Sequence, residues 1–72
     1  MEKEYKIEIE RFGKRIRSIR KSQMMSQLEL EVASGIDRTE ISRIENGLKN
    51  IEFMTMVRLA ESLKVQLVDL FS

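Results

Sequence analysis

Apolar residues recur along most of the chain at the three- and four-residue spacing of an α-helix, and no long stretch alternates between apolar and polar. The first series predicts a helix from about residue 8 to residue 22. Its apolar face consists of Tyr5, Ile9, Phe12, Ile16 and Ile19. A broader face over about 51–63 consists of Phe53, Met56, Val57, Ala60 and Leu63. The pattern predicts an all-α protein.

Polar residues mark the boundaries of two short helices between these faces. Ser26 and Glu29 form an S-x-x-E capping box, in which each side chain satisfies a free amide at a helix start. Gly35 can adopt the left-handed conformation that a tight turn needs after this helix. Asp37 and Glu40 repeat the capping-box spacing, so we expect a third helix to begin there.

The remaining boundaries complete a bundle. We expect Gly47 to close the third helix, Asn50 to cap the fourth, and residues 65–71 to add a last short helical turn. The short connections predict five helices packed as one compact domain over 1–72. Residues 1–8 form an N-terminal extension, in whole or in part continuous with the first helix.

Composition narrows the chemistry. The chain has no Cys and no His, which excludes disulfides, thiolate chemistry and the usual zinc spacings. No nucleophile–base pair, metal cluster or phosphate-binding loop is recognisable, so we expect neither catalysis nor a cofactor. We also expect a cytoplasmic protein with no membrane association, because no apolar run reaches the roughly 18 residues of a span and the N-terminus lacks a signal peptide's apolar stretch.

Charge is unevenly distributed. The net charge is only +1, but residues 11–21 carry six basic side chains and no acidic one. Lys14, Arg17 and Lys21 fall on the face opposite the apolar stripe. A solvated surface and a contact with nucleic acid both explain this basic face.

The stretch "GIDRTEISRIENG", residues 35–47, has a more specific pattern. Two short helices joined by a Gly-containing turn, the second of them amphipathic, are typical of a helix-turn-helix. Ile41 and Ile44 point to one side, whereas the opposite side and the exposed N-terminal end carry Arg38, Thr39, Ser42, Arg43 and Asn46. Such a face suits the DNA major groove, since Arg binds guanine bidentately. An ordinary exposed helix could show the same polarity.

The segments "SQLELEVASGIDRTEISRIENGLKN" and "LAESLKVQLVDLF" resemble the phage-repressor-like (Cro/repressor, XRE-type) helix-turn-helix family. The similarity covers about residues 9–71. It implies a five-helix, lambda-repressor-like domain whose third helix enters the major groove of double-stranded DNA, usually as a homodimer on a two-fold operator.

The resemblance also implies residue roles. The bases would be contacted by Arg38, Thr39, Ser42 and Arg43. The DNA backbone would be contacted by Gln27, Asp37 and Asn46. A capping role explains Asp37 without DNA. The chain departs from the family pattern at Glu31, Ile51 and Lys64, which stand where Ala, Pro and Gly are frequent.

Two further contacts are expected. Arg20 and Glu45 each flank an apolar stripe, and the family resemblance suggests that they form a buried ion pair between the first and third helices. The C-terminal third holds more apolar residues than one small core can bury, and an exposed apolar patch usually marks an interface. We therefore expect homodimer contacts from Met54, Met56, Leu67, Leu70 and Phe71.

These observations predict a sequence-specific DNA-binding transcriptional regulator. Two alternatives remain open: an antitoxin whose surface also binds a toxin, and a controller protein of a restriction–modification system. A neighbouring toxin gene would favour the first, and a neighbouring restriction–modification pair the second.

Overall fold

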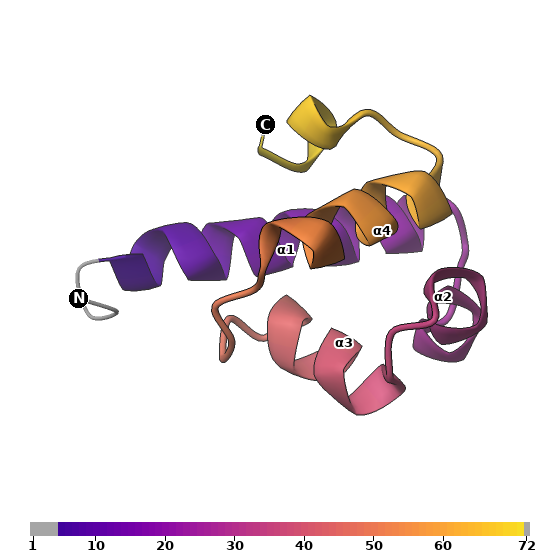
Figure 1. Cartoon of the computed structure of the whole chain (residues 1–72), viewed down its shortest axis with the longest axis horizontal. Helices are drawn as coiled ribbons and strands as arrows, with labels where there is room; N and C mark the ends of the chain where they lie inside the picture. The colour runs from indigo at the N-terminus through magenta and orange to yellow at the C-terminus, as the bar shows by residue number, and fades with distance from the viewer. Residues whose placement is uncertain (1–4, 72) are drawn as a thin grey trace.

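The computed structural model describes residues 5–71, which form four α-helices and a closing 3₁₀-helix (Figure 1). The elements are α1 (Lys6–Ser22), α2 (Gln27–Ser34), α3 (Arg38–Glu45), α4 (Phe53–Leu63) and η2 (Leu67–Phe71). No strand occurs within 5–71. The all-α prediction is confirmed, with one difference: the fifth helix is a single stretch of 3₁₀-helix. Of the expected N-terminal extension, residues 6–8 belong to α1, and residues 1–4 lie outside the described part.

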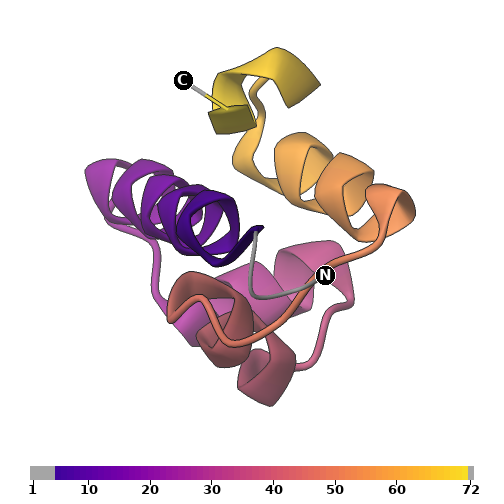
Figure 2. The same cartoon turned by 90° about the vertical axis from the view of Figure 1, so that its left-hand side faces the viewer.

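The helices surround one core. α4 runs alongside α1, η2 crosses above both, and α2 and α3 close the opposite side (Figures 1 and 2). All five elements contribute fully buried side chains, namely Ile16, Leu30, Ile41, Ile44, Leu59, Leu63 and Leu70. Each such side chain contributes about 1.5–3 kcal/mol through burial. Ile41 and Ile44 therefore anchor α3, which leaves its opposite face free.

The turn between α2 and α3 has a fixed shape. Gly35 ends α2 in the left-handed conformation, with φ 73°, and its amide donates to the Glu31 carbonyl. Ile36 is buried, and its amide donates to Ser34 Oγ at 3.1 Å. The turn is thus held both by a helix cap and by a core residue.

Of the two predicted capping boxes, the structure contains the one at the start of α2 and not the one at the start of α3. Ser26 and Glu29 form the reciprocal capping box. At α3, Asp37 is the N-cap, but its carboxylate accepts from Thr39 N, and Glu40 pairs with Lys49 at 3.1 Å instead of completing a box. The expectation of a second reciprocal box was wrong because the Lys49 ammonium takes the Glu40 carboxylate.

The start of α4 also differs from expectation. Asn50 does not cap it: the helix begins at Phe53, its N-cap position is Glu52, and no side chain caps that end. Residues 50–52 are instead extended or irregular, and they carry the chain from α3 across to α4.

Gly13 sets the spacing between α1 and α3. It is buried in the middle of α1, where glycine is unfavourable by about 1 kcal/mol relative to alanine. A Cβ atom at this position would overlap the carbonyl oxygen of Ile44 and lie 3.0 Å from that of Glu45. Only glycine lets the two backbones approach this closely.

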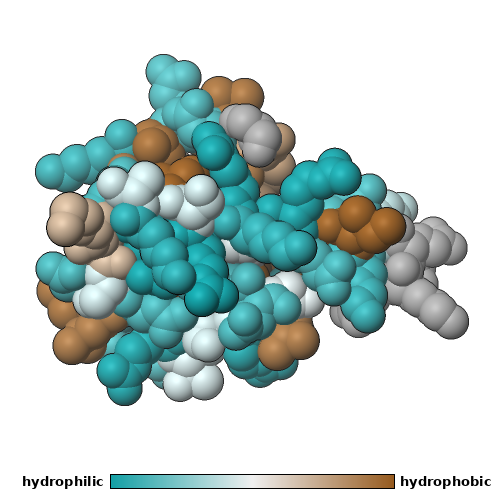
Figure 3. Space-filling view, turned by 180° about the vertical axis from the view of Figure 1, so that it is seen from behind, coloured by the Kyte–Doolittle hydropathy of each residue, from teal (hydrophilic) through white to brown (hydrophobic). Residues whose placement is uncertain are grey.

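The outer face of α1 is polar. Lys14, Arg17 and Lys21 are exposed, and the side of the molecule that α1 covers is mostly hydrophilic, with its apolar areas separated (Figure 3). Within residues 5–71, no helix combines the length and the apolar character needed to cross a membrane.

Candidate nucleic-acid interface

The outward face of α3 carries the side chains predicted to read bases. Arg38, Thr39 and Arg43 are exposed, and Ser42 is half-buried. Because Ile41 and Ile44 are inserted in the core, Ser42 and Arg43 between them face away from it. Hydroxyl and guanidinium groups thus line one side of a short helix whose other side is immobilised.

The first turn of α3 is stabilised by the side chain of its N-cap residue. Asp37 Oδ1 accepts from the Thr39 amide at 3.0 Å. This contact satisfies one free amide and fixes the entry of the chain into the helix. It accounts for Asp37 structurally, and it holds the backbone beneath Arg38 and Thr39 in place.

Behind α3 lies the predicted ion pair. Arg20 Nε donates to Glu45 Oε2 at 2.7 Å, and Nη2 donates to Oε1 at 3.0 Å, so the pair is bidentate. The third nitrogen, Nη1, donates to the Met25 carbonyl at 2.7 Å. The hydrogen bond to Glu45 raises the pKa of Arg20 against the opposing effect of burial. Both side chains are almost fully buried, as expected.

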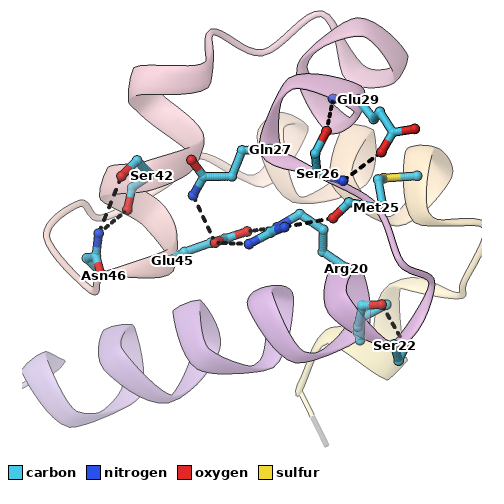
Figure 4. A network of polar contacts seen from close by, with 10 residues as sticks. Arg20, Ser22, Met25, Ser26, Gln27, Glu29, Ser42, Glu45 and Asn46 are labelled. Atoms are coloured by element: carbon cyan, nitrogen blue, oxygen red, sulfur yellow. Dashed lines mark hydrogen bonds and ion pairs between the residues drawn. The ribbon is translucent and has the colours of Figure 1, made fainter.

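Gln27 joins this pair. Its Nε2 donates to Glu45 Oε1 at 3.1 Å, and Figure 4 shows the amide directed toward the carboxylate. The family resemblance implied that Gln27 contacts the DNA backbone, and no pattern in the sequence linked it to Glu45. The structure places it in the first turn of α2, half-buried, in contact with α3.

Asn46 lies at the other end of α3. It occupies the C-cap position, and its Nδ2 donates to the Ser42 carbonyl at 2.9 Å (Figure 4). The side chain is exposed. Gln27 and Asn46 therefore flank the Ser42–Glu45 end of α3, but only Gln27 is tied to the ion pair.

Comparison with known proteins agrees with this geometry. The helix-turn-helix family pattern matches residues 16–70, which include all of α2, α3 and α4. This chain belongs to the helix-turn-helix family. It is a DNA-binding regulator of transcription, in agreement with the relatives that it matches.

Three relatives illustrate the match to this helix-turn-helix protein. Control protein C.MunI from Mycoplasma sp is 33% identical over 63 residues, covering 86% of this chain and 85% of that protein. Control protein C.BamHI from Bacillus amyloliquefaciens is 38% identical over 60 residues, covering 82% and 74%. The crystal structure of the restriction–modification controller protein C.AhdI from Aeromonas hydrophila matches with a TM-score of 0.88 and 31% identity, covering 90% of this chain and 98% of that one.

The residues predicted for dimerisation differ in exposure in this helix-turn-helix chain. Met54 and Phe71 are more than half exposed, and Met56 and Leu67 are half-buried. Leu70 is fully buried, so its inclusion among interface residues was wrong. It faces the core from η2, which packs against both α1 and α4.

An apolar hollow of about 600 Å³ lies beside these residues. α1, the segment before α4, α4 itself and η2 line it, with Phe12, Ile51, Met56 and Phe71 among its apolar side chains. The Phe12 and Phe71 rings are in contact, with centroids 5.3 Å apart. Tyr5 and Phe71 both line the hollow, so this surface combines both ends of the described chain.

Gly13 and Lys49 position the helix-turn-helix although the sequence analysis assigned them no role. Gly13 admits the backbone of α3, and Lys49 ties the following loop back to Glu40. A glycine within an otherwise strong helical pattern was the available signal for the first. Lys49 offered none, since a single surface lysine is ordinary.

Proposed function

We propose that this protein is a controller of a restriction–modification system that regulates transcription by binding a two-fold DNA operator as a homodimer. The observation that carries the proposal is the agreement in fold over 98% of the length of C.AhdI, a restriction–modification controller. Its activity is binding rather than catalysis, and its place of action is the cytoplasm.

In this proposal α3 enters the major groove. Thr39 and Arg43 lie four residues apart on its exposed side and contact base edges, with Arg38 and Ser42 beside them. Arg43 suits a guanine, because its guanidinium donates to two acceptors of that base. Gln27, Asp37 and Asn46 lie at helix ends, where they contact the backbone as the motif docks.

A second copy completes the site. The C-terminal third has four large apolar side chains that are each about three-fifths exposed: Phe53, Met54, Val68 and Phe71. A dimer would bury this apolar surface. Two copies related by two-fold symmetry would present two α3 helices to half-sites about 10–10.5 base pairs apart.

The DNA site is tested by selection from random duplexes. The purified protein should enrich an inverted repeat, and the Arg43→Ala variant should lose one preferred base pair in each half-site. An Asn50→Ala variant, altered outside α3, should retain the repeat. Enrichment of no sequence would contradict specific recognition.

The controller role is tested in cells. The selected repeat should occur upstream of adjoining endonuclease and methyltransferase genes, and expression of the protein should change the output of a reporter joined to that upstream region. A reporter with both half-sites replaced serves as the control. A repeat found only beside a toxin gene would favour the antitoxin alternative instead.

A further inference from the structure

The Arg20–Glu45 ion pair contacts Gln27, a residue of the proposed DNA interface, and in this contact Gln27 is the donor and Glu45 the acceptor. Glu45 is held by two hydrogen bonds from Arg20, at 2.7 and 3.0 Å. An ionised carboxylate only accepts hydrogen bonds. The Gln27 side chain, 3.1 Å away, must therefore present its NH₂ group to Glu45 and its carbonyl oxygen elsewhere.

That orientation leaves one donor unused. The Gln27 Nε2 carries two hydrogens, of which Glu45 takes one. The other is fixed by the plane of the amide, on a side chain that is half-buried at the start of α2. A loose glutamine would instead lose rotamer freedom on meeting a phosphate, at a cost in affinity.

We propose that Arg20 and Glu45 are positioning residues for DNA binding: they hold the Gln27 amide so that its second N–H donates to a backbone phosphate. The inference rests on the proposed function. It gives the buried pair a role in affinity besides its role in holding α1 to α3, and it predicts that the benefit of Gln27 depends on Glu45.

A double-mutant cycle tests this dependence. Arg20→Met combined with Glu45→Met replaces the pair by apolar side chains of similar volume, a change that folded proteins often tolerate. In the wild-type chain, Gln27→Ala should weaken binding to the selected operator and to unrelated DNA by about five- to tenfold. In the double-methionine chain, the same change should weaken it less than about twofold, because the amide is no longer held.

Asn46→Ala is the matched control. Its amide bonds to Ser42 and not to Glu45, so its fold-loss should be equal in both backgrounds. Equal losses for Gln27→Ala in both backgrounds would overturn the inference while leaving DNA binding intact. A wild-type chain that binds no DNA would overturn both the inference and the proposed function.

NMR of the wild-type side-chain amides decides the matter even if the double-methionine chain does not fold. The Gln27 NH₂ should give two resolved, motionally restricted proton signals, one displaced by the charged acceptor, and the other should shift on adding the operator. Free-chain shifts and motion for both protons would overturn the inference.

Discussion

The Glu45 carboxylate accepts hydrogen bonds from two other helices, through Arg20 of α1 and Gln27 of α2. Truncating it should be costly, because Glu45→Ala leaves the Arg20 guanidinium buried without its partner. We expect a loss of about 3–5 kcal/mol in the free energy of unfolding, measured by urea titration. The Arg20→Met/Glu45→Met chain is the control, and it should stay close to wild type. A Glu45→Ala chain of unchanged stability would show that burial of the pair contributes nothing.

Alanine substitutions of Arg43 and Asn46 should weaken DNA binding in different ways. Arg43→Ala should cost about 1–3 kcal/mol on the preferred site and relax the preference at one base pair per half-site. Asn46→Ala should weaken binding to all sequences more evenly. Competition against single-base operator variants measures both. The assignment fails if Arg43→Ala keeps the wild-type ranking of sites while Asn46→Ala changes it.

Residue-scale contacts were predictable only where two signals agreed. Arg20 and Glu45 both flank apolar stripes, and the family resemblance paired them. The Gln27 contact was not predictable, because Gln27 and Glu45 lie in different helices and no helical periodicity relates them. Leu70 was misplaced for a similar reason: an apolar residue near a chain end has no pattern that separates core from surface.

The end of α4 carries a strained residue. Lys64 is its C-cap in the left-handed conformation, with φ 58°, where residues with a Cβ are disfavoured and glycine is common. Lys64→Gly should therefore stabilise the chain by about 1 kcal/mol. Thermal unfolding measures the change. Lys14→Gly, at an exposed position in the middle of α1, is the control and should destabilise the chain by about 1 kcal/mol. A Lys64→Gly chain less stable than wild type would contradict the strain at Lys64.

The stabilisation that the capping box at the start of α2 provides should depend on pH. The backbone amide of Ser26, and then its hydroxyl, lower the pKa of Glu29 from its ordinary value of 4.5. A lowered pKa means that the folded state favours the ionised form. This stabilisation is present above the ordinary pKa and is lost as the pH falls through the lowered one.

Wild type should thus lose more stability between about pH 6 and pH 3 than Glu29→Gln, which has no charge to lose. Urea midpoints at the two pH values measure the difference. Glu61→Gln, at an exposed position of α4 outside the capping box, is the control and should lose as much as wild type. Equal losses for Glu29→Gln and wild type would show that the capping box does not depend on the charge.

At the scale of elements, periodicity predicted α1 and α4, whereas capping residues and the Gly35 turn predicted α2 and α3. Ser26 and Glu29 marked α2 correctly because both partners of the box lie within one turn. Asn50 misled because asparagine favours turns and caps alike, and here it belongs to the segment before α4. The 3₁₀ form of η2 was not predictable, since five residues are too few to separate two helical periods.

For the whole molecule, the proposed dimer should depend on exposed apolar residues of the C-terminal third. Met54 is 60% exposed on α4, so Met54→Glu should leave the monomer folded but charge the interface. Sedimentation should then show a monomer, and operator affinity should fall by a factor of about a hundred or more, as paired binding is lost. Val32→Glu, altering a 79% exposed residue of α2, should sediment like wild type. A monomeric wild type would contradict the interface.

The close contact at Gly13 has a consequence for which positions of the chain can change in sequence and which cannot. The Gly13 contact, the buried side chains of Ile41 and Ile44, and the hydrogen bonds of Glu45 all act on the inner side of α3. The side chains on its outer face take no part in placing it. Residues 38, 39, 42 and 43 are therefore free to change one at a time, and new DNA specificities can evolve or be engineered without repacking the interior. In a saturation library selected for binding to any of several operators, positions 39 and 43 should diversify with the operator. Position 13 should return glycine every time.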